Sequence, residues 1–363
     1  MDNLVMRYVI FTFLSLFFLN LSTFASQKGV KELSEKAVSK NQVAGIVVIS
    51  GNAQKIENIF CTGNTSTKSK IQLTPDSIFD MASVTKAVAI STALAICYDR
   101  ELIDLDVPFT KYLPQYKCKL KNPPTVRDLA MHVSGFIGKP YGKAKNGKAM
   151  LEQSLQFKPK HPVGAKYEYA CWNFILLGQI LENITKQPLD EFCKKEIFEP
   201  LSMASTSLGK PITTEKSRLV KTIGSPDYGT ISDPHARIIY RDGYCSGNAG
   251  MFSTANDLAK FCQMMLNCGK INNKQFLKKS FVELTTNKCQ AQNAKRSFGW
   301  DMTTTSLPKN FSEKSITHSG WSGQTVFIDL ENNKFVVVLT VRSGDHKKCK
   351  KYRIEIAKEA IEK

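Results

Sequence analysis

The sequence predicts an α+β fold in which an antiparallel sheet, built from both chain ends and flanked by helices, carries a large, mostly helical insertion. Three observations support this prediction. Strand-like segments lie at about 42–63, helical periodicity dominates about 80–290, and strand-like segments return only at about 296–342. Two distant groups of strands that share a helical cover are expected to pair in one sheet.

Local patterns define the individual elements. A polar helix near residues 29–40 precedes two strands, "VAGIVVISG" and "IENIFCTG", which are expected to form a hairpin. Helical periodicity covers residues 84–102, "TVRDLAMHVSG", "FILLGQILENITK", "LDEFCKKEIFEPL" and "TANDLAKFCQMMLNCG". The closing strands are "SFGWDMT", "SITHSG", "TVFIDL" and "KFVVVLTVR", and "YRIEIAKEAIEK" is expected to end the chain as a helix.

Residues 1–25 are typical of an export signal. Arg7 supplies the positive start, "YVIFTFLSLFFLNL" is apolar, and the segment ends at the small residue Ala25. The remaining chain, 26–363, is expected to form one domain that is periplasmic or extracellular, or membrane-anchored if the signal is not cleaved. We expect no transmembrane span after the signal is removed.

The composition excludes several classes of protein. With 42% hydrophobic residues the chain can form a sizeable core, so it is neither disordered nor fibrous. Its net charge of +18 would attract anionic envelope polymers or lipid head groups, but the lysines are scattered and no nucleic-acid motif occurs, so solvated lysine faces explain it more simply. The ten cysteines lack zinc-site spacing, and their disulfide pairing stays open.

A candidate nucleophile lies in "IFDMASVTKAVAI". The Ser-x-x-Lys spacing puts Ser83 and Lys86 one helical turn apart, where the amine can take the proton of the hydroxyl. A buried apolar helix would lower the pKa of the lysine, as a base requires. The alternative is a serine N-cap followed by a partly exposed lysine.

The same spacing occurs twice more, at Ser207 and Ser306, so the context has to decide. Glycine and proline interrupt "SLGKP", and proline stands inside "SLPK". Only Ser83 opens an unbroken helical run, which favours it as the nucleophile.

Two further segments could complete such a site. Tyr169 stands just before an apolar helix, where its phenol could move a proton to or from Ser83, with a surface-directed packing tyrosine as the alternative. In "ITHSGWSGQTVFID", the residues His318, Ser319 and Gly320 end a strand along whose edge a substrate could lie.

The chain resembles the serine β-lactamase-related hydrolases, and in particular their class C-like branch with penicillin-binding proteins, D-amino-acid peptidases and esterases. Six segments over residues 30–345 carry the resemblance in the family's order: "FDMASVTKA", "TVRDLAMHVSGF", "YEYACWNFILLGQILENIT", "GNAGMFSTANDLAKFCQMMLNCG", "FGW" and "THSGWSGQTVFID". The resemblance implies a β-lactamase/transpeptidase-like fold that needs no metal and no cofactor.

The resemblance also implies a role for each matching residue. Ser83 would be acylated, Lys86 would help to deprotonate it, and Tyr169, the first residue of the Tyr-x-Asn element, would assist proton transfer. The backbone N–H groups of Ser83 and Trp321 would form the oxyanion hole. His318 would replace the lysine of the Lys-Thr-Gly element, with Ser319 and Gly320 completing it.

This chain departs from the family pattern at two positions. Cys171 replaces the asparagine of the Tyr-x-Asn element, and His318 removes a permanent cation that could hold a substrate carboxylate. We therefore expect an exported serine hydrolase with esterase- or peptidase-like activity on a small-molecule or peptide substrate, which includes cell-envelope components. The alternatives are a D,D-peptidase or weak β-lactamase, and a catalytically silent domain that binds an envelope ligand. If Cys171 lies outside the site, Tyr167 would have to replace Tyr169.

Overall fold

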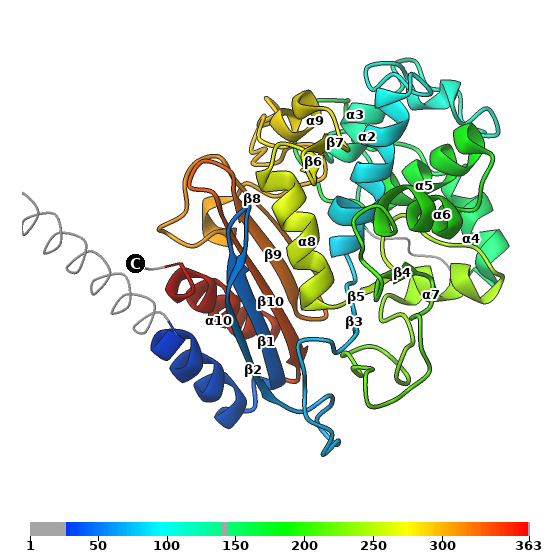
Figure 1. The fold of residues 1–363 in the computed structure, drawn as a ribbon. Coiled ribbons are helices and arrows are strands. Elements are labelled where there is room, and N and C mark those ends of the chain that lie inside the picture. Colours follow the sequence, from blue (N-terminus) through cyan, green and yellow to red (C-terminus); the bar gives the residue numbers. More distant parts are fainter. Residues whose placement is uncertain (1–26, 139–143, 362–363) are drawn as a thin grey trace, which may run out of the picture.

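The computed structural model describes residues 27–138 and 144–361, so the expected export signal at 1–25 lies outside the described residues. Figure 1 shows a sheet with helices on both faces, next to a second, mostly helical region that the middle of the chain forms. No helix in the described ranges is long and apolar enough to cross a membrane.

One five-stranded antiparallel sheet combines both ends of the chain. Its order is β2-β1-β10-β9-β8, with bounds β1 Val43–Gly51, β2 Ile56–Gly63, β8 Ser315–Ser319, β9 Gln324–Asp329 and β10 Lys334–Arg342. The antiparallel pairing of β1 with β10 joins the two groups of strands. The expected fold class, an antiparallel sheet from both chain ends with flanking helices, is confirmed.

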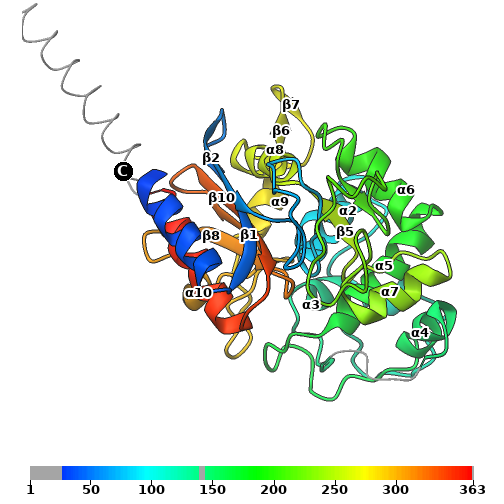
Figure 2. The same cartoon turned by 90° about the horizontal axis from the view of Figure 1, so that it is seen from below.

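Helices cover the sheet on both faces, which explains its nearly continuous apolar strands. The helix over residues 27–39 and α10 (His346–Glu359) lie on the outer face, and α8 (Ala255–Leu266) packs on β1 and β10 from the inner side (Figures 1 and 2). Successive residues of β1 alternate accordingly. Val47 belongs to the main core, whereas Val48 packs in the cluster under the terminal helices.

The helical region and small sheets complete the fold. Its helices are α2 Thr92–Asp99, α3 Val126–Ala130, α4 Gly147–Ser154, α5 Cys171–Thr185, α6 Leu189–Cys193, α7 Pro234–Arg241 and α9 Lys279–Leu284, with π-helical η1 Lys86–Ser91 and η3 Lys194–Phe198 and 3₁₀-helical η2 Phe109–Lys111 and η4 Thr304–Ser306. Two minor sheets contain β3 Phe79–Asp80, β5 Met251–Ser253 and β4 Ser207–Leu208, and β6 Lys270–Ile271 with β7 Lys274–Gln275.

The prediction of a strand in "SFGWDMT" is wrong. Within this segment only Asp301 forms bridges, one to Arg296 and one to Thr317 of β8, and both are isolated. Gly299 has a φ of 81°, and its N–H donates to the carbonyl of Ala130 at 3.2 Å instead of to a strand. A Cβ on Gly299 would lie 2.0 Å from Ser91 Oγ, so this glycine lets the segment pack directly on η1.

The sheet permits a matched test of the core. Ile49 of β1 is fully buried, whereas its cross-strand partner Ile59 on the edge strand β2 is 51% exposed. Ile49→Ala should lower the free energy of unfolding by about 2–5 kcal/mol, because a cavity remains, and Ile59→Ala by about 1 kcal/mol or less. Urea unfolding measures both values. Equal losses would contradict the burial pattern of the sheet.

Candidate active site

Ser83 lies where β3 passes into the helix that begins with η1. The first turn of this helix is closed by N–H groups of Val84, Thr85 and Lys86, which donate to the carbonyls of Met81, Ala82 and Ser83. Ser83 is half-buried, while Lys86, the first residue of η1, is fully buried. The alternative interpretation, a serine N-cap followed by a partly exposed lysine, is therefore wrong, because Lys86 is buried.

Three polar side chains meet at Ser83 Oγ. Lys86 Nζ donates to Ser83 Oγ at 3.0 Å, and the hydroxyl of Tyr169 donates to the same oxygen at 2.9 Å. Lys86 Nζ also donates to the backbone carbonyl of Asn248 at 2.6 Å. The arrangement can remove the proton from Ser83 during attack on a carbonyl carbon.

The other two Ser-x-x-Lys serines have different surroundings. Ser207 begins the short strand β4, and its Oγ donates to the backbone carbonyl of Lys210 at 2.5 Å. Ser306 ends the 3₁₀ turn η4, and its Oγ accepts a hydrogen bond from Lys350. In neither case does the lysine of the motif donate to its serine.

The charge state of Lys86 depends on its neighbours. Burial lowers its pKa, but attraction to the anionic forms of Cys171 and Tyr169, together with a hydrogen bond to Tyr169, leaves the pKa above its ordinary value. The expectation from the sequence that burial lowers the pKa of Lys86 is therefore wrong, because the neighbouring groups outweigh burial. The pKa of Lys86 is therefore determined by side chains that are distant from it in the sequence.

Tyr169 is held from behind by a histidine that the sequence patterns did not single out. The ring of His132 lies 4.5 Å from that of Tyr169, and its Nδ1 accepts the N–H of Ala170 at 3.2 Å. Asn173 Nδ2 lies 3.1 Å from the same nitrogen. These contacts fix the histidine ring, which in turn supports one face of the tyrosine. His132 begins "HVSG", which lies in one of the segments that carry the family resemblance, so that segment could have indicated a residue near the site.

A guanidinium also approaches Tyr169. The Cζ atom of Arg296 lies 5.5 Å from the centre of the Tyr169 ring and 5.3 Å from that of Tyr167, whose hydroxyl accepts from Arg296 Nε at 3.1 Å. Tyr167 therefore contacts the arginine, and the tyrosine at Ser83 is Tyr169. Asp301 pairs with Arg296 at 3.4 Å. Arg296 lies just before "FGW" in the sequence, and no sequence pattern indicated that its side chain would reach the site.

Cys171 is a buried free cysteine at the first position of α5. Its thiol contributes to the raised pKa of Lys86, as a group close to the amine does. Asn173, the next asparagine along the chain, does not replace the missing amide, because its side chain bonds to Ser134 and His132. The backbone carbonyl of Asn248 instead anchors the lysine.

His318 enters the site from β8 as a buried and unpartnered ring. It is 3% exposed, and neither ring nitrogen has a hydrogen-bond partner among the described residues. Burial, with the positive charges of Arg296 and Lys86, holds its pKa well below the usual range. The ring is thus neutral near pH 7 and offers one donor and one acceptor to a ligand.

The end of β8 lies against the turn that precedes Ser83. A Cβ on Gly320 would lie 2.6 Å from the carbonyl oxygen of Met81, so only glycine permits this approach. The hydroxyl groups of Ser319 and Thr325 lie 3.0 Å apart. Across the described ranges, the backbone N–H groups of Ser83 and Trp321 donate to no protein acceptor. Both remain free to bind an oxyanion.

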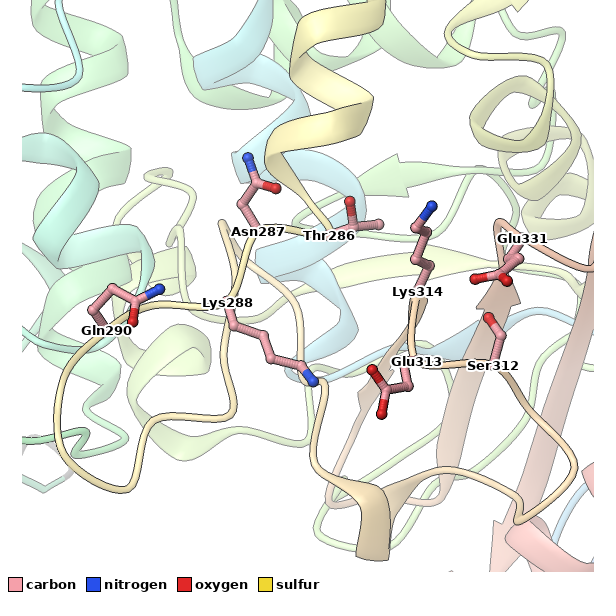
Figure 3. A pocket seen from close by; sticks show the side chains of 8 residues that line it. All are labelled: Thr286, Asn287, Lys288, Gln290, Ser312, Glu313, Lys314 and Glu331. Atoms are coloured by element: carbon pink, nitrogen blue, oxygen red, sulfur yellow. The ribbon is translucent and has the colours of Figure 1, made fainter.

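Other hollows lie apart from these residues. A surface pocket of about 680 Å³ lies between the loop with Lys288 and the segment with Glu313 and Lys314. The residues that line it, labelled in Figure 3, include none of the expected site residues. Within the part of the chain that the structure describes, no group of three or more His, Cys, Asp or Glu side chains could hold a metal ion.

Comparisons with known proteins agree on one family. Residues 30–359 match the family model described as Beta-lactamase. A protein of Salmonella typhimurium named "Putative D-alanyl-D-alanine carboxypeptidase" is 30% identical over 313 residues, which cover 76% of this chain and 72% of that protein.

Solved structures share the fold. EstCE1, a hydrolase with promiscuous acyltransferase activity, has a TM-score of 0.74 at 19% identity, covering 94% of this chain and 99% of that one. A class C β-lactamase from Rhodobacter sphaeroides has a TM-score of 0.72 at 17% identity, covering 92% and 98%. At these identities the matches establish the fold alone.

The depressed pKa of His318 predicts a pH dependence of stability. Above about pH 6.5 the ring is neutral in both states; below it the unfolded chain binds a proton that the folded chain excludes. The free energy of unfolding should therefore decrease as the pH is lowered below about 6.5. His318→Gln should reduce the slope of the free energy of unfolding against pH by up to about 1.4 kcal/mol per pH unit. Urea unfolding between pH 5 and 8 measures it, with the partly exposed His161→Gln as control. An unchanged slope in His318→Gln would contradict the neutral, buried ring.

Proposed function

Because this chain belongs to the beta-lactamase family, we propose that it is a serine hydrolase that cleaves an ester or amide substrate through an acyl-enzyme at Ser83. One observation carries the proposal: Ser83 Oγ accepts hydrogen bonds from both Lys86 Nζ and the Tyr169 hydroxyl, at 3.0 and 2.9 Å. A serine between two proton-transfer groups has the surroundings of an activated nucleophile.

The reaction follows from these contacts. Ser83 Oγ attacks the carbonyl carbon while its proton passes to the Lys86–Tyr169 pair, and the carbonyl oxygen becomes an oxyanion between the amides of Ser83 and Trp321. The pair returns the proton to the leaving alcohol or amine as the bond breaks. Water then attacks the acyl group and loses a proton to the same pair, which passes it to Ser83 Oγ as the acid product leaves.

The two groups of the pair both reach the proton of the nucleophile. The Tyr169 oxygen is in direct contact with Ser83 Oγ, and Lys86 Nζ contacts the same oxygen. Either group, once it has given up a proton of its own, can accept the proton of the serine.

Two features favour esters over amides as substrates. No side-chain amide follows Tyr169 at the position of Cys171, and His318 is a neutral ring in place of a permanent cation. Both changes remove contacts to an amide side chain and to a carboxylate. An ester, which has the better leaving group, depends less on such contacts.

A second candidate is D,D-carboxypeptidase activity on cell-wall peptides, which the names of the Salmonella relatives favour. The expected export signal and these relatives both suit a protein of the cell envelope. The catalytically silent binding domain is the weaker alternative, because such a domain would not need Lys86 and Tyr169 in contact with Ser83.

Covalent labelling tests the nucleophile. A fluorophosphonate should label the wild-type protein at Ser83, and Ser83→Ala should abolish labelling, because Ser83 is the Ser-x-x-Lys serine whose lysine donates to it. Intact mass and peptide mapping measure the adduct. Ser207→Ala and Ser306→Ala are matched controls and should keep full labelling. An adduct at either of these serines, or persistent labelling of Ser83→Ala, would refute the assignment.

Cys171 tests the substrate class. Cys171→Asn restores a side-chain amide beside Lys86 and should raise kcat/KM for D-Ala-D-Ala peptides relative to a short p-nitrophenyl ester by about 10-fold, the effect of roughly one new hydrogen bond. Steady-state assays on both substrates give the ratio. A wild-type protein that already cleaves the peptide faster than the ester would instead favour the carboxypeptidase candidate.

A further inference from the structure

The residue before the nucleophile has an unfavourable backbone conformation. Ala82 has a φ of 45°, in the left-handed region that residues with a Cβ rarely adopt. Such a conformation persists only where the surroundings impose it. Since Ala82 and Ser83 share a peptide bond, the conformation of Ala82 also sets the direction of the Ser83 N–H, one of the two donors to the oxyanion.

Asp80 holds this conformation. Its Oδ1 accepts the N–H of Ala82 at 3.0 Å, which is a local side-chain to backbone bond two residues along the chain. On the other side of Ala82, Thr85 Oγ1 donates to the Ala82 carbonyl at 2.6 Å. The N–H and the carbonyl of the left-handed residue are therefore both fixed by side chains.

Asp80 also joins the turn to two other segments of the site. Its Oδ2 accepts the N–H of Ser232, which precedes α7, at 2.7 Å. Its backbone carbonyl lies 3.5 Å from Ser322 Oγ, whose hydroxyl donates to Gln324 Oε1 at 2.6 Å, so the contact with Asp80 is one of packing. Ser322 directly follows Trp321, whose amide is the second candidate donor. Asp80 therefore bonds to the turn before Ser83 and packs against the segment that carries Trp321.

Burying the Asp80 carboxylate costs free energy of folding. Asp80 is 1% exposed, and burial raises its pKa despite the N–H donors that lower it. Throughout the described residues no basic side chain pairs with it. A buried, unpaired carboxylate is a poor choice for stability, and local rules of this kind are broken most often at functional sites.

We propose that Asp80 is a positioning residue of the oxyanion hole: its carboxylate imposes the left-handed turn at Ala82 and so aims the Ser83 N–H beside that of Trp321. The inference rests on the proposed acyl transfer at Ser83. Asp80 itself touches no reacting atom, and it acts only through the backbone that it holds.

Asp80→Asn keeps the shape but replaces one acceptor oxygen by an NH₂ group, which must face the N–H of either Ala82 or Ser232. We expect kcat for a p-nitrophenyl ester and the fluorophosphonate labelling rate to fall about 10- to 100-fold, somewhat less than for loss of a whole oxyanion donor. KM should change less than about threefold, because ground-state binding does not use the oxyanion geometry. Urea unfolding checks that the variant is folded, because the NH₂ group leaves one of these backbone N–H groups without its acceptor.

The matched control is Asp329→Asn at the far end of β9. Asp329 is also fully buried and also accepts two backbone N–H groups, from Ser312 and Asn332, at 2.8 and 3.1 Å. It lies on no segment next to Ser83. Asp329→Asn should therefore lower stability and leave kcat of the folded protein unchanged.

A rescue separates positioning from general damage. Glycine adopts the left-handed region without strain, so Ala82→Gly added to Asp80→Asn should recover at least about threefold of the lost kcat. Asp80→Glu, which keeps the charge but moves the oxygens by one methylene, serves as the second variant if Asp80→Asn does not fold. It should show the same loss of kcat.

The outcomes are distinct. Wild-type kcat in folded Asp80→Asn or Asp80→Glu, or an equal loss in Asp329→Asn, would overturn the inference while the proposed function stands. A loss that appears only in KM, or one that Ala82→Gly does not relieve, would also overturn it. A wild-type protein that no probe acylates at Ser83 would refute the proposed function and this inference together.

Discussion

A buried ammonium group with few partners is the constraint on which the site depends. Lys86 is fully enclosed, so each of its hydrogen-bond donors must find an acceptor or the charge becomes too costly. Ser83 Oγ and the Asn248 carbonyl accept two of its three N–H groups, and the faces of Tyr169 and Phe174 lie 5.2 and 5.8 Å away. These contacts bring η1, α5 and the segment before β5 to one point.

The fold was largely accessible to sequence reasoning. Apolar periodicity identified both groups of strands and the helices between them, because elements with two covered faces leave strong patterns. The failure at "SFGWDMT" has a local cause. Gly299, with a φ of 81° against η1, gives the segment a tertiary role that overrides its apolar alternation.

The site was accessible only in part. Ser83, Lys86 and Tyr169 carry their chemistry in their side chains and spacing, and the structure brings them together. The Asn248 contact uses a backbone carbonyl, which any residue type could supply, so no sequence pattern marks it. Arg296 reaches Tyr169 through the tertiary fold alone. The pKa of Lys86 likewise depends on neighbours that are distant in sequence.

The pairing of β1 with β10 also determines when the molecule can fold. Val43 lies opposite Arg342, so the centre of the sheet cannot close until almost the whole chain has been synthesised. The entropy of closing such a long loop must be overcome before the contacts form, which makes folding slow and leaves the early strands exposed in the meantime. The two early strands, β1 and β2, therefore need protection from aggregation until β10 is available to pair with β1.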